Sequence, residues 1–330
     1  MAFTLKICVY GAGAIGSWLG ARLHIAGYST TLVTRGPHLE KLTTDGLTFI
    51  DEGNSETLRI PATEDVSSLG KQDLIFVTLK AHSIPQVVEQ IKSLMHKDSV
   101  VITAVNGVPW WFFYRLGADF PEQPVYSVDP EGRIWNEITP AKTVGCVIYP
   151  SADLPRPGTV THLSGDQLPI GEPDGTESER AQLISEVLTN AQCRSPIRKH
   201  LRNEIWIKLL GNLGFNPLSV LLNETLDKLA TGERSRALAA ELMVECLAVG
   251  KGYGLRIGMT IEKRINGAAK VGPHRTSMLQ DYLRGKPLEV GSIVDAVIEL
   301  AELVSVPVPT IHKARDRLLK KLSSENISTN

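Results

Sequence analysis

Gly11-Ala12-Gly13-Ala14-Ile15-Gly16 is the stretch of this chain that decides its fold. It follows a short, nearly all-apolar run, 5–10, and precedes a good helix sequence, 17–26, which Gly27 closes. The G-x-G-x-x-G pattern alone is weak, but a buried strand before it and a helix after it are typical of a dinucleotide-binding βαβ unit. The alternative, a glycine-rich turn without a ligand, is disfavoured by this context.

Strand and helix patterns alternate on the carboxyl side of this turn. Apolar runs of strand length recur at 29–35, 73–79 and 99–105, and residues 84–95 carry apolar side chains at helical spacing. This alternation predicts an α/β fold with a Rossmann-like, doubly wound parallel sheet. Between 124 and 171, short strand-like runs separated by Pro and Gly (143–149, 158–163 and 167–170) predict an antiparallel extension of that sheet.

After Pro196 the sequence becomes strongly helical, which predicts an all-helical second domain. We expect a dinucleotide-binding domain at 1–199, a helical substrate and catalytic domain at 200–322, and a frayed polar tail at 323–330. The expected helices span 201–215, 234–253, 257–271, 290–304 and 310–322.

Composition narrows the class of protein. The 330 residues fit two domains, and 42% hydrophobic and 22% charged residues are typical of a soluble globular protein. A net charge of -1 gives no global attraction to nucleic acid or anionic membrane, and neither an apolar run of about 20 residues nor a signal peptide is recognised. We therefore expect a cytoplasmic protein. The widely spaced cysteines (Cys8, Cys146, Cys193 and Cys246) predict core packing and no metal site.

The cofactor is predicted from the turn and from the end of the second strand. Gly11 permits the tight turn, Gly13 lets the backbone approach a pyrophosphate, and Gly16 allows close packing of helix on strand; the amides from Ala14 and Ile15 onward face the phosphates. An NAD enzyme usually has Asp or Glu at the end of the second strand, whereas this chain has Arg35, which can bind a 2′-phosphate. We predict NADP(H). Lys80, after a later strand, lies at the same sheet edge or is simply a solvated lysine.

Lys208, Asn212 and Asn216 recur at intervals of four residues, so they share one helix face. Three polar heads beside apolar neighbours indicate either a polar ligand site or the outer face of an amphipathic helix, and the pattern does not separate these alternatives. Ser277 could cap a helix, and Glu289 could be a first-turn acid.

Several blocks together resemble the ketopantoate reductases (2-dehydropantoate 2-reductases): residues 11–16, 77–81, Asn106-Gly107, 206–217 and 276–281. The resemblance spans nearly the whole chain in the family's order. It implies a Rossmann-like domain, a helical domain and a cleft between them. It also implies NADPH-dependent reduction of 2-dehydropantoate to pantoate, a step of pantothenate and coenzyme A biosynthesis.

The resemblance also implies roles for individual residues. Lys208 matches the general acid that protonates the carbonyl oxygen, and Glu289 matches the catalytic carboxylate near it. Asn106 matches the asparagine beside nicotinamide and substrate, while Arg35 and Lys80 match positions associated with the 2′-phosphate. Asn212, Asn216 and Ser277 match substrate-binding positions.

Two stretches depart from the family pattern and leave the identity of the 2-oxo acid open. His274 stands where an asparagine is common, and five aromatic residues, Trp110 to Tyr114, replace a more polar sequence. Most of these aromatics are expected in the core, but Trp110 or Trp111 could form an apolar wall that favours a bulkier or less polar 2-oxo acid. A non-catalytic NADP-sensing protein is a second alternative. The long apolar helices at 234–253 and 290–304 leave room for a homodimer interface.

Overall fold

The glycine-rich turn joins β1 (Lys6–Tyr10) to α1 (Ala14–Ile25) in a computed structural model that describes residues 5–325 and 327. β2 (Ser29–Val33) pairs in parallel with one side of β1, and β6 (Gln72–Val77) pairs in parallel with the other. The sheet therefore changes its direction of growth beside β1. Ligands of open α/β sheets bind at such a switch point, outside the carboxyl ends of the strands.

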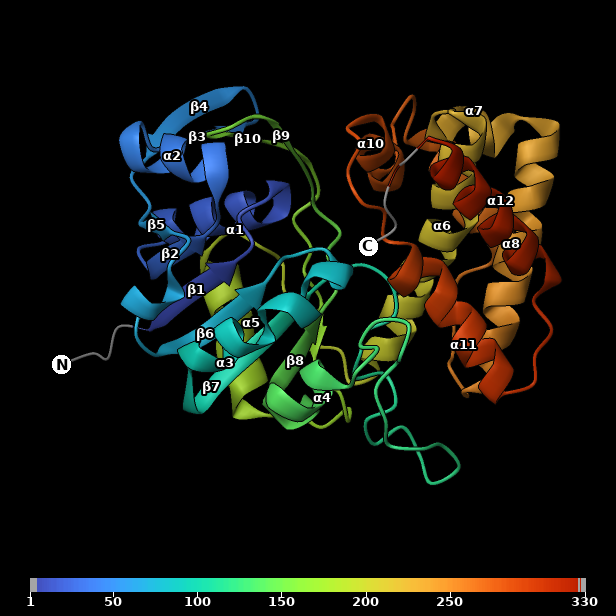
Figure 1. The fold of residues 1–330 in the computed structure, drawn as a ribbon, viewed down its shortest axis with the longest axis horizontal. Helices are drawn as coiled ribbons and strands as arrows, with labels where there is room; N and C mark the ends of the chain where they lie inside the picture. The colour runs from blue at the N-terminus through green and yellow to red at the C-terminus, as the bar shows by residue number, and fades with distance from the viewer. Residues whose placement is uncertain (1–4, 326, 328–330) are drawn as a thin grey trace. The chain divides into compact units, whose positions relative to one another are not determined.

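Seven strands form the main sheet, in the order β11-β8-β7-β6-β1-β2-β5 (Figure 1). β5 (Ala62–Thr63) pairs in parallel with β2, and β7 (Met95–Ala104) pairs in parallel with both β6 and β8 (Thr143–Cys146). The edge strand β11 (Ile170–Gly171) is antiparallel to β8. The predicted Rossmann-like parallel sheet with an antiparallel extension is confirmed, with β11 as the antiparallel strand. Within the run at 143–149, which was predicted to belong to that extension, β8 is instead parallel to β7.

A second sheet of four strands, in the order β4-β3-β10-β9, belongs to the same unit. It contains β3 (Leu47–Asp51), β4 (Asn54–Leu58), β9 (Ser151–Arg156) and β10 (Thr159–Ser164). The run at 158–163, predicted to extend the main sheet, instead pairs with β3. The β3–β4 hairpin was not predicted, because most of β4 is exposed and lacks an apolar run. Helix α1 contacts β1 and β2 of the main sheet and β9 and β10 of the second one.

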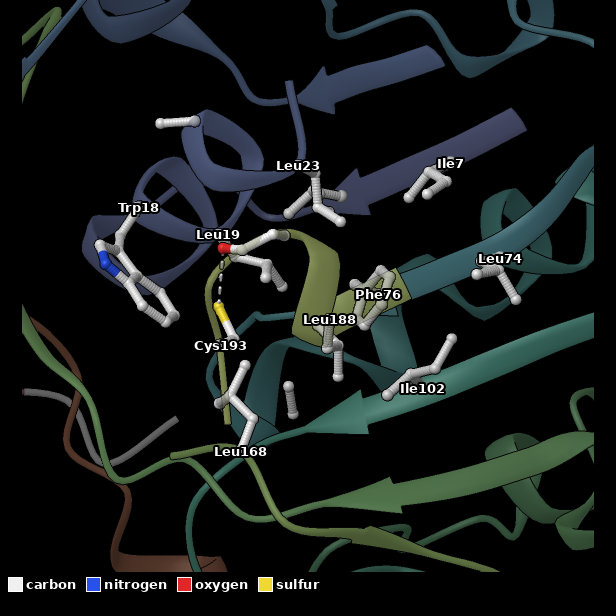
Figure 2. Close-up of a cluster of buried hydrophobic side chains, with 14 of the residues drawn as sticks. Ile7, Trp18, Leu19, Leu23, Leu74, Phe76, Ile102, Leu168, Leu188 and Cys193 are labelled. Carbon is white, nitrogen blue, oxygen red and sulfur yellow. Dashed lines mark hydrogen bonds between the residues drawn. The ribbon is translucent and has the colours of Figure 1, made fainter. Parts of the chain in front are cut away.

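Buried side chains from both sheets, from α1 and from the helix at 179–190 form the core of this unit, and Figure 2 shows part of it. Ile7, Trp18, Leu23, Phe76 and Ile102 are completely buried. The remaining helical segments are α2 (Gly36–Thr44), η1 (Val66–Ser68), η2 (Ala81–Ser83), η3 (Pro85–Val87), α3 (Val88–Leu94), α4 (Arg133–Glu137), η4 (Pro140–Lys142) and α5 (Glu179–Asn190).

The four cysteines are free and buried, which confirms their predicted place in the core. Cys193 lies in the cluster of Figure 2, with its Sγ 3.5 Å from the Ala191 carbonyl oxygen. Burial raises the pKa of the Cys8 and Cys193 thiols to about 12, so both are protonated at neutral pH.

The second unit is helical, as predicted. Its elements are α6 (Leu201–Leu222), α7 (Leu226–Thr231), α8 (Glu233–Gly252), α9 (Ile261–Lys270), α10 (Ser277–Leu283), the π-helical turn η5 (Gly291–Asp295), α11 (Ala296–Leu303) and α12 (Pro309–Ser324) (Figure 1). Two earlier segments, Asn106–Phe112 and Pro124–Glu131, pack with this unit. The Glu299 carboxylate on α11 anchors the latter by accepting hydrogen bonds from the amides of Tyr126 and Ser127. The continuous domain boundary near residue 199 stays a prediction.

Helix α6 continues to Leu222, so its predicted end at Phe215 is wrong. Pro217 removes one helical N–H donor, but tertiary packing outweighs this local loss. A Cβ on Gly214 would lie 2.4 Å from Met243 Cε, which shows how closely α6 approaches α8. Among the described residues, α6 is the one helix long and apolar enough to cross a membrane, but 72% of its most apolar window is buried, as in a core helix.

The polar end of the chain is only partly covered by the structure. Helix α12 includes residues 323 and 324 of the tail that was expected to fray. Residues 326 and 328–330 of that tail lie outside the described residues.

Candidate active site

Two glycines of the turn are required by packing. Gly11 has φ +105°, and a Cβ there would lie 2.7 Å from Leu79 Cδ2. A Cβ on Gly16 would lie 2.2 Å from the Gly11 carbonyl oxygen and 2.6 Å from Thr78 Oγ1. Thr78 Oγ1 donates a hydrogen bond of 2.8 Å to that same carbonyl. Any side chain at either position would therefore displace the turn between β1 and α1.

Gly13 differs, because among residues 5–325 and 327 no atom lies within 4 Å of a Cβ built on it. Packing within the protein therefore gives no reason for glycine here, whereas close approach of a phosphate would. Gly13 caps α1 without a side chain, and the first turn of α1 contains no acidic residue. The first amides of α1, from Ala14, Ile15 and Gly16, thus keep the partial positive charge that attracts phosphate oxygens.

Arg35 and Lys80 follow strands that flank β1. Tyr10, the last residue of β1, is in register with Val33 of β2 and Val77 of β6. Both cations therefore lie at the carboxyl edge that carries the glycine-rich turn. Arg35 is exposed and precedes α2, whose first turn also lacks an acid. Burial raises the pKa of Tyr10 to about 12, and the nearby charge of Arg35 opposes that rise.

In the second unit, Asn106 links Lys208 to Glu289. The Lys208 Nζ donates to Asn106 Oδ1 at 2.7 Å, and Asn106 Nδ2 donates to Glu289 Oε2 at 3.3 Å. Lys208 is half-buried on α6, and Glu289 is only 5% exposed just before η5. Residues separated by up to 183 positions thus form one network of an ammonium, an amide and a buried carboxylate.

The turn that carries Asn106 is held by backbone packing against η5. Gly107 has φ +87°, and a Cβ there would lie 2.3 Å from the Ser292 carbonyl oxygen. That carbonyl accepts a hydrogen bond of 2.8 Å from the Val108 amide. Ser292 was not predicted from the sequence. The available signal was the Asn-Gly pair directly after a strand, which indicates a turn but not its partner.

Gly107→Ala should therefore disturb the network. We expect kcat to fall about tenfold or more, because a 1 Å misplacement of catalytic groups costs up to about 10². The dissociation constant of NADPH should change little. Gly254→Ala is the matched control, since Gly254 also has positive φ but no described atom within 4 Å of its Cβ position. Steady-state kinetics of both variants measure the change in kcat, and thermal unfolding measures the change in stability. Equal losses in the two would assign the effect to backbone strain alone.

The remaining predicted site residues occupy α6 and α10. Asn212 is half-buried and Asn216 is 4% exposed, and they follow Lys208 on successive turns of α6. Asn216 Nδ2 is buried without a hydrogen-bond partner among the described residues. Ser277 is exposed at the start of α10, and Thr276, not Ser277, caps that helix by accepting from the Leu279 amide.

Comparisons with known proteins agree with this architecture. The family model "Ketopantoate reductase PanE/ApbA" matches residues 7–175, and its C-terminal counterpart matches 200–319. A 2-dehydropantoate 2-reductase of Mesorhizobium japonicum is 42% identical over 308 residues, which are 93% of this chain and 94% of that protein.

This chain belongs to the ketopantoate reductase family. The crystal structure of a candidate ketopantoate reductase from Ralstonia solanacearum has a TM-score of 0.93 at 34% identity, over 98% of this chain and 99% of that one. A ternary structure of D-mandelate dehydrogenase with NADH and anilino(oxo)acetate has a TM-score of 0.85 over 98% and 100% of the chains. At 20% identity, the latter likeness shows the fold alone. The protein is thus an oxidoreductase of this family.

Most of the aromatic stretch from Trp110 to Tyr114, which was predicted to depart from the family pattern, lies in the core. Trp110 and Trp111 are each 1% exposed. The Phe112 ring centroid lies 5.7 Å from that of Trp206 and 5.3 Å from that of Tyr253. Core packing is therefore confirmed for most of the stretch, and the described contacts do not favour an apolar substrate wall.

His274, the other departure, lies in the loop before α10. Its carbonyl accepts from the Leu226 amide at 2.8 Å, and its own amide donates to the Gly272 carbonyl at 2.7 Å. The backbone at this position is therefore fixed through groups that any residue would supply. The structure does not explain why histidine replaces asparagine here.

Proposed function

We propose that this chain reduces 2-dehydropantoate to pantoate with NADPH and that Lys208 is the general acid. The observation that carries the proposal is the Lys208–Asn106–Glu289 network, because it places an ammonium in a half-buried site and fixes its direction through a second polar group. Membership of the ketopantoate reductase family supports the same reaction.

The residues at the carboxyl edge of the main sheet fit the cofactor. Gly13 leaves the backbone accessible, and the first amides of α1 can bind the pyrophosphate. Arg35, with Lys80 at the same carboxyl edge of the sheet, would bind the 2′-phosphate. NADPH, when bound, supplies the hydride for the reaction.

Lys208 acts on the oxygen of the substrate carbonyl. As that carbon gains a hydride, negative charge builds on the oxygen, and a nearby ammonium stabilises it. A proton then moves from Nζ to the oxygen, which leaves a 2-hydroxy acid and a neutral amine that regains a proton from solvent. Asn106 accepts from Lys208 and donates to Glu289, so the orientation of its amide is fixed. Glu289 takes part through Asn106, because its Oε2 accepts the hydrogen bond that fixes the far side of that amide.

The substrate carboxylate and hydroxyl require hydrogen-bond donors. Asn212 and Asn216 continue the stripe of Lys208 along α6, and the buried Nδ2 of Asn216 is a donor that gains from a ligand partner. Ser277 completes the proposed set from the start of α10. We expect these three residues to affect KM more than cofactor affinity.

A panel of 2-oxo acids tests the proposal. We expect NADPH oxidation with 2-dehydropantoate, and kcat/KM about 10²-fold or more above that for phenylglyoxylate, because a site built to bind a hydroxyl discriminates strongly. Trp110→Phe and Trp111→Phe should leave this ratio within about threefold, since both side chains are buried. A preference for the aromatic acid would support the bulkier-substrate alternative. Tight NADPH binding without turnover of any acid would support the sensor.

Two further expectations belong to this proposal. A biosynthetic reductase of a small acid is expected in the cytoplasm. A homodimer would bury apolar side chains that α8 and α11 expose, among them Val244 at 54% and Leu303 at 48%. Sedimentation or light scattering of the purified protein measures its oligomeric state.

A further inference from the structure

A buried histidine, His38, lies in the first turn of α2, close in sequence to Arg35. It is only 8% exposed, and both of its ring nitrogens have partners. Nδ1 lies 3.0 Å from the Gly158 amide nitrogen, and Nε2 lies 3.1 Å from Ser17 Oγ. Ser17 is completely buried in the first turns of α1, and its Oγ lies 3.0 Å from the Ala12 carbonyl oxygen.

The donors and acceptors define the direction of this chain of hydrogen bonds. The Gly158 amide can only donate, so Nδ1 of His38 must be an unprotonated acceptor. The ring proton is therefore on Nε2, which donates to Ser17 Oγ, and the Ser17 hydroxyl then donates to Ala12. Burial lowers the pKa of His38, which agrees with a neutral ring. All three bonds point from the β9–β10 turn towards the glycine-rich turn.

The two ends of this chain of hydrogen bonds, at Gly158 and at Ala12, are each fixed by further contacts. The Gly158 carbonyl accepts from the Thr48 amide at 2.8 Å, and a Cβ on Gly158 would lie 2.8 Å from Lys41 Cβ, so the β9–β10 turn packs against both β3 and α2. At the other end, the Ala12 amide donates to the Val33 carbonyl at 3.1 Å. With Ser17 bound to its carbonyl, both polar backbone groups of Ala12 are held, directly before Gly13.

We propose that His38, acting through Ser17, is a positioning residue that holds the Ala12–Gly13 backbone in the conformation that binds the cofactor. The inference rests on the proposed binding of NADPH at this turn. His38 need not touch the cofactor, because its effect passes through Ser17 to the Ala12 carbonyl. We call this chain of hydrogen bonds from Gly158 through His38 and Ser17 to Ala12 the relay. Because the pyrophosphate is common to NADPH and NADH, loss of the relay should weaken the binding of both dinucleotides by the same factor.

Three single variants, and the double variant that combines His38→Leu with Ser17→Ala, test the relay. His38→Leu removes both ring contacts, Ser17→Ala removes the hydroxyl, and His38→Gln keeps an amide that can accept from Gly158 and donate to Ser17. His24→Leu, on α1 but outside the relay, is the control. Dissociation constants for NADPH and NADH are measured by calorimetry without substrate, at a temperature where circular dichroism shows each variant to be folded.

We expect His38→Leu and Ser17→Ala each to weaken both dinucleotides about tenfold, the usual effect of losing a buried hydrogen bond. The double variant should bind the dinucleotides no more weakly than the weaker-binding single variant, because the two substitutions interrupt the same chain of hydrogen bonds. His38→Gln should recover most of the affinity, and the NADPH-to-NADH ratio should stay constant throughout. Unchanged dissociation constants in folded His38→Leu and Ser17→Ala, or additive losses in the double variant, would overturn the relay.

These outcomes are separate from those that test the proposed function. Wild-type protein that binds NADPH but turns over no 2-oxo acid would contradict the proposed function and leave the relay intact. Wild-type turnover of 2-dehydropantoate, together with wild-type affinity in the folded relay variants, would overturn the relay alone.

Discussion

Lys208→Ala should lower kcat roughly 10²–10⁴-fold, the usual contribution of a positioned acid. The ammonium of Lys208 is held 2.7 Å from Asn106 Oδ1, and in the proposed reaction its removal leaves the developing oxyanion without its proton donor. The dissociation constant of NADPH should change little, because the groups proposed to bind its phosphates, the first amides of α1 together with Arg35 and Lys80, belong to the first unit. Stopped-flow and steady-state kinetics with 2-dehydropantoate measure the effect.

Lys228→Ala is a suitable control for this variant. Lys228 lies on α7 of the same unit, and its side chain is 67% exposed. Among the ion pairs described, it pairs only with Glu224, four residues earlier in the chain. We expect wild-type kinetics from it. If Lys208→Ala retained kcat within a factor of a few, another group would have to supply the proton.

Arg35→Asp should reduce the preference for NADPH over NADH about tenfold or more. A charge-assisted hydrogen bond to the 2′-phosphate contributes about 1.5–3 kcal/mol, and the introduced carboxylate repels the phosphate while it can accept from the 2′-hydroxyl of NADH. The ratio of the two dissociation constants, measured at constant ionic strength, gives the result directly.

The same change of charge can be made away from the sheet edge as a control. Lys97→Asp alters an 89% exposed side chain of the same unit by two charges and should leave the cofactor preference unchanged. Retention of the full preference in Arg35→Asp would instead assign the 2′-phosphate to Lys80 or to a residue not recognised here. Lys80→Ala then distinguishes these possibilities.

The main sheet and the helical unit were predictable because their signals are local. The central strands β1 and β6 are nearly continuous apolar runs because most of their residues are buried, and the glycine-rich turn marks where β1 ends. The β3–β4 hairpin was missed because four of the five residues of β4 are exposed. The end of α6 was misplaced because Pro217 is a strong local signal that tertiary packing overrides. Such packing energies cannot be read from a single window of sequence.

The candidate site was predicted in part for the same reason. The stripe of Lys208, Asn212 and Asn216 follows from helical periodicity alone. The bridge through Asn106 to Glu289 joins residues 183 positions apart and was not predicted; only the family resemblance indicated that both residues belong to the site. Neither the contact of Gly107 with Ser292 nor the relay through His38 has a sequence pattern, because both depend on how separate elements pack.

The transfer of a labelled hydride tests the central claim most directly. Purified protein is incubated with 2-dehydropantoate and NADPH deuterated at C4 on the transferred face, and the product is analysed by mass spectrometry and NMR. We predict one pantoate per NADPH oxidised, with deuterium at C2, and loss of this product in Lys208→Ala. Tightly bound NADPH that is not oxidised, or pantoate without deuterium at C2, would contradict the account.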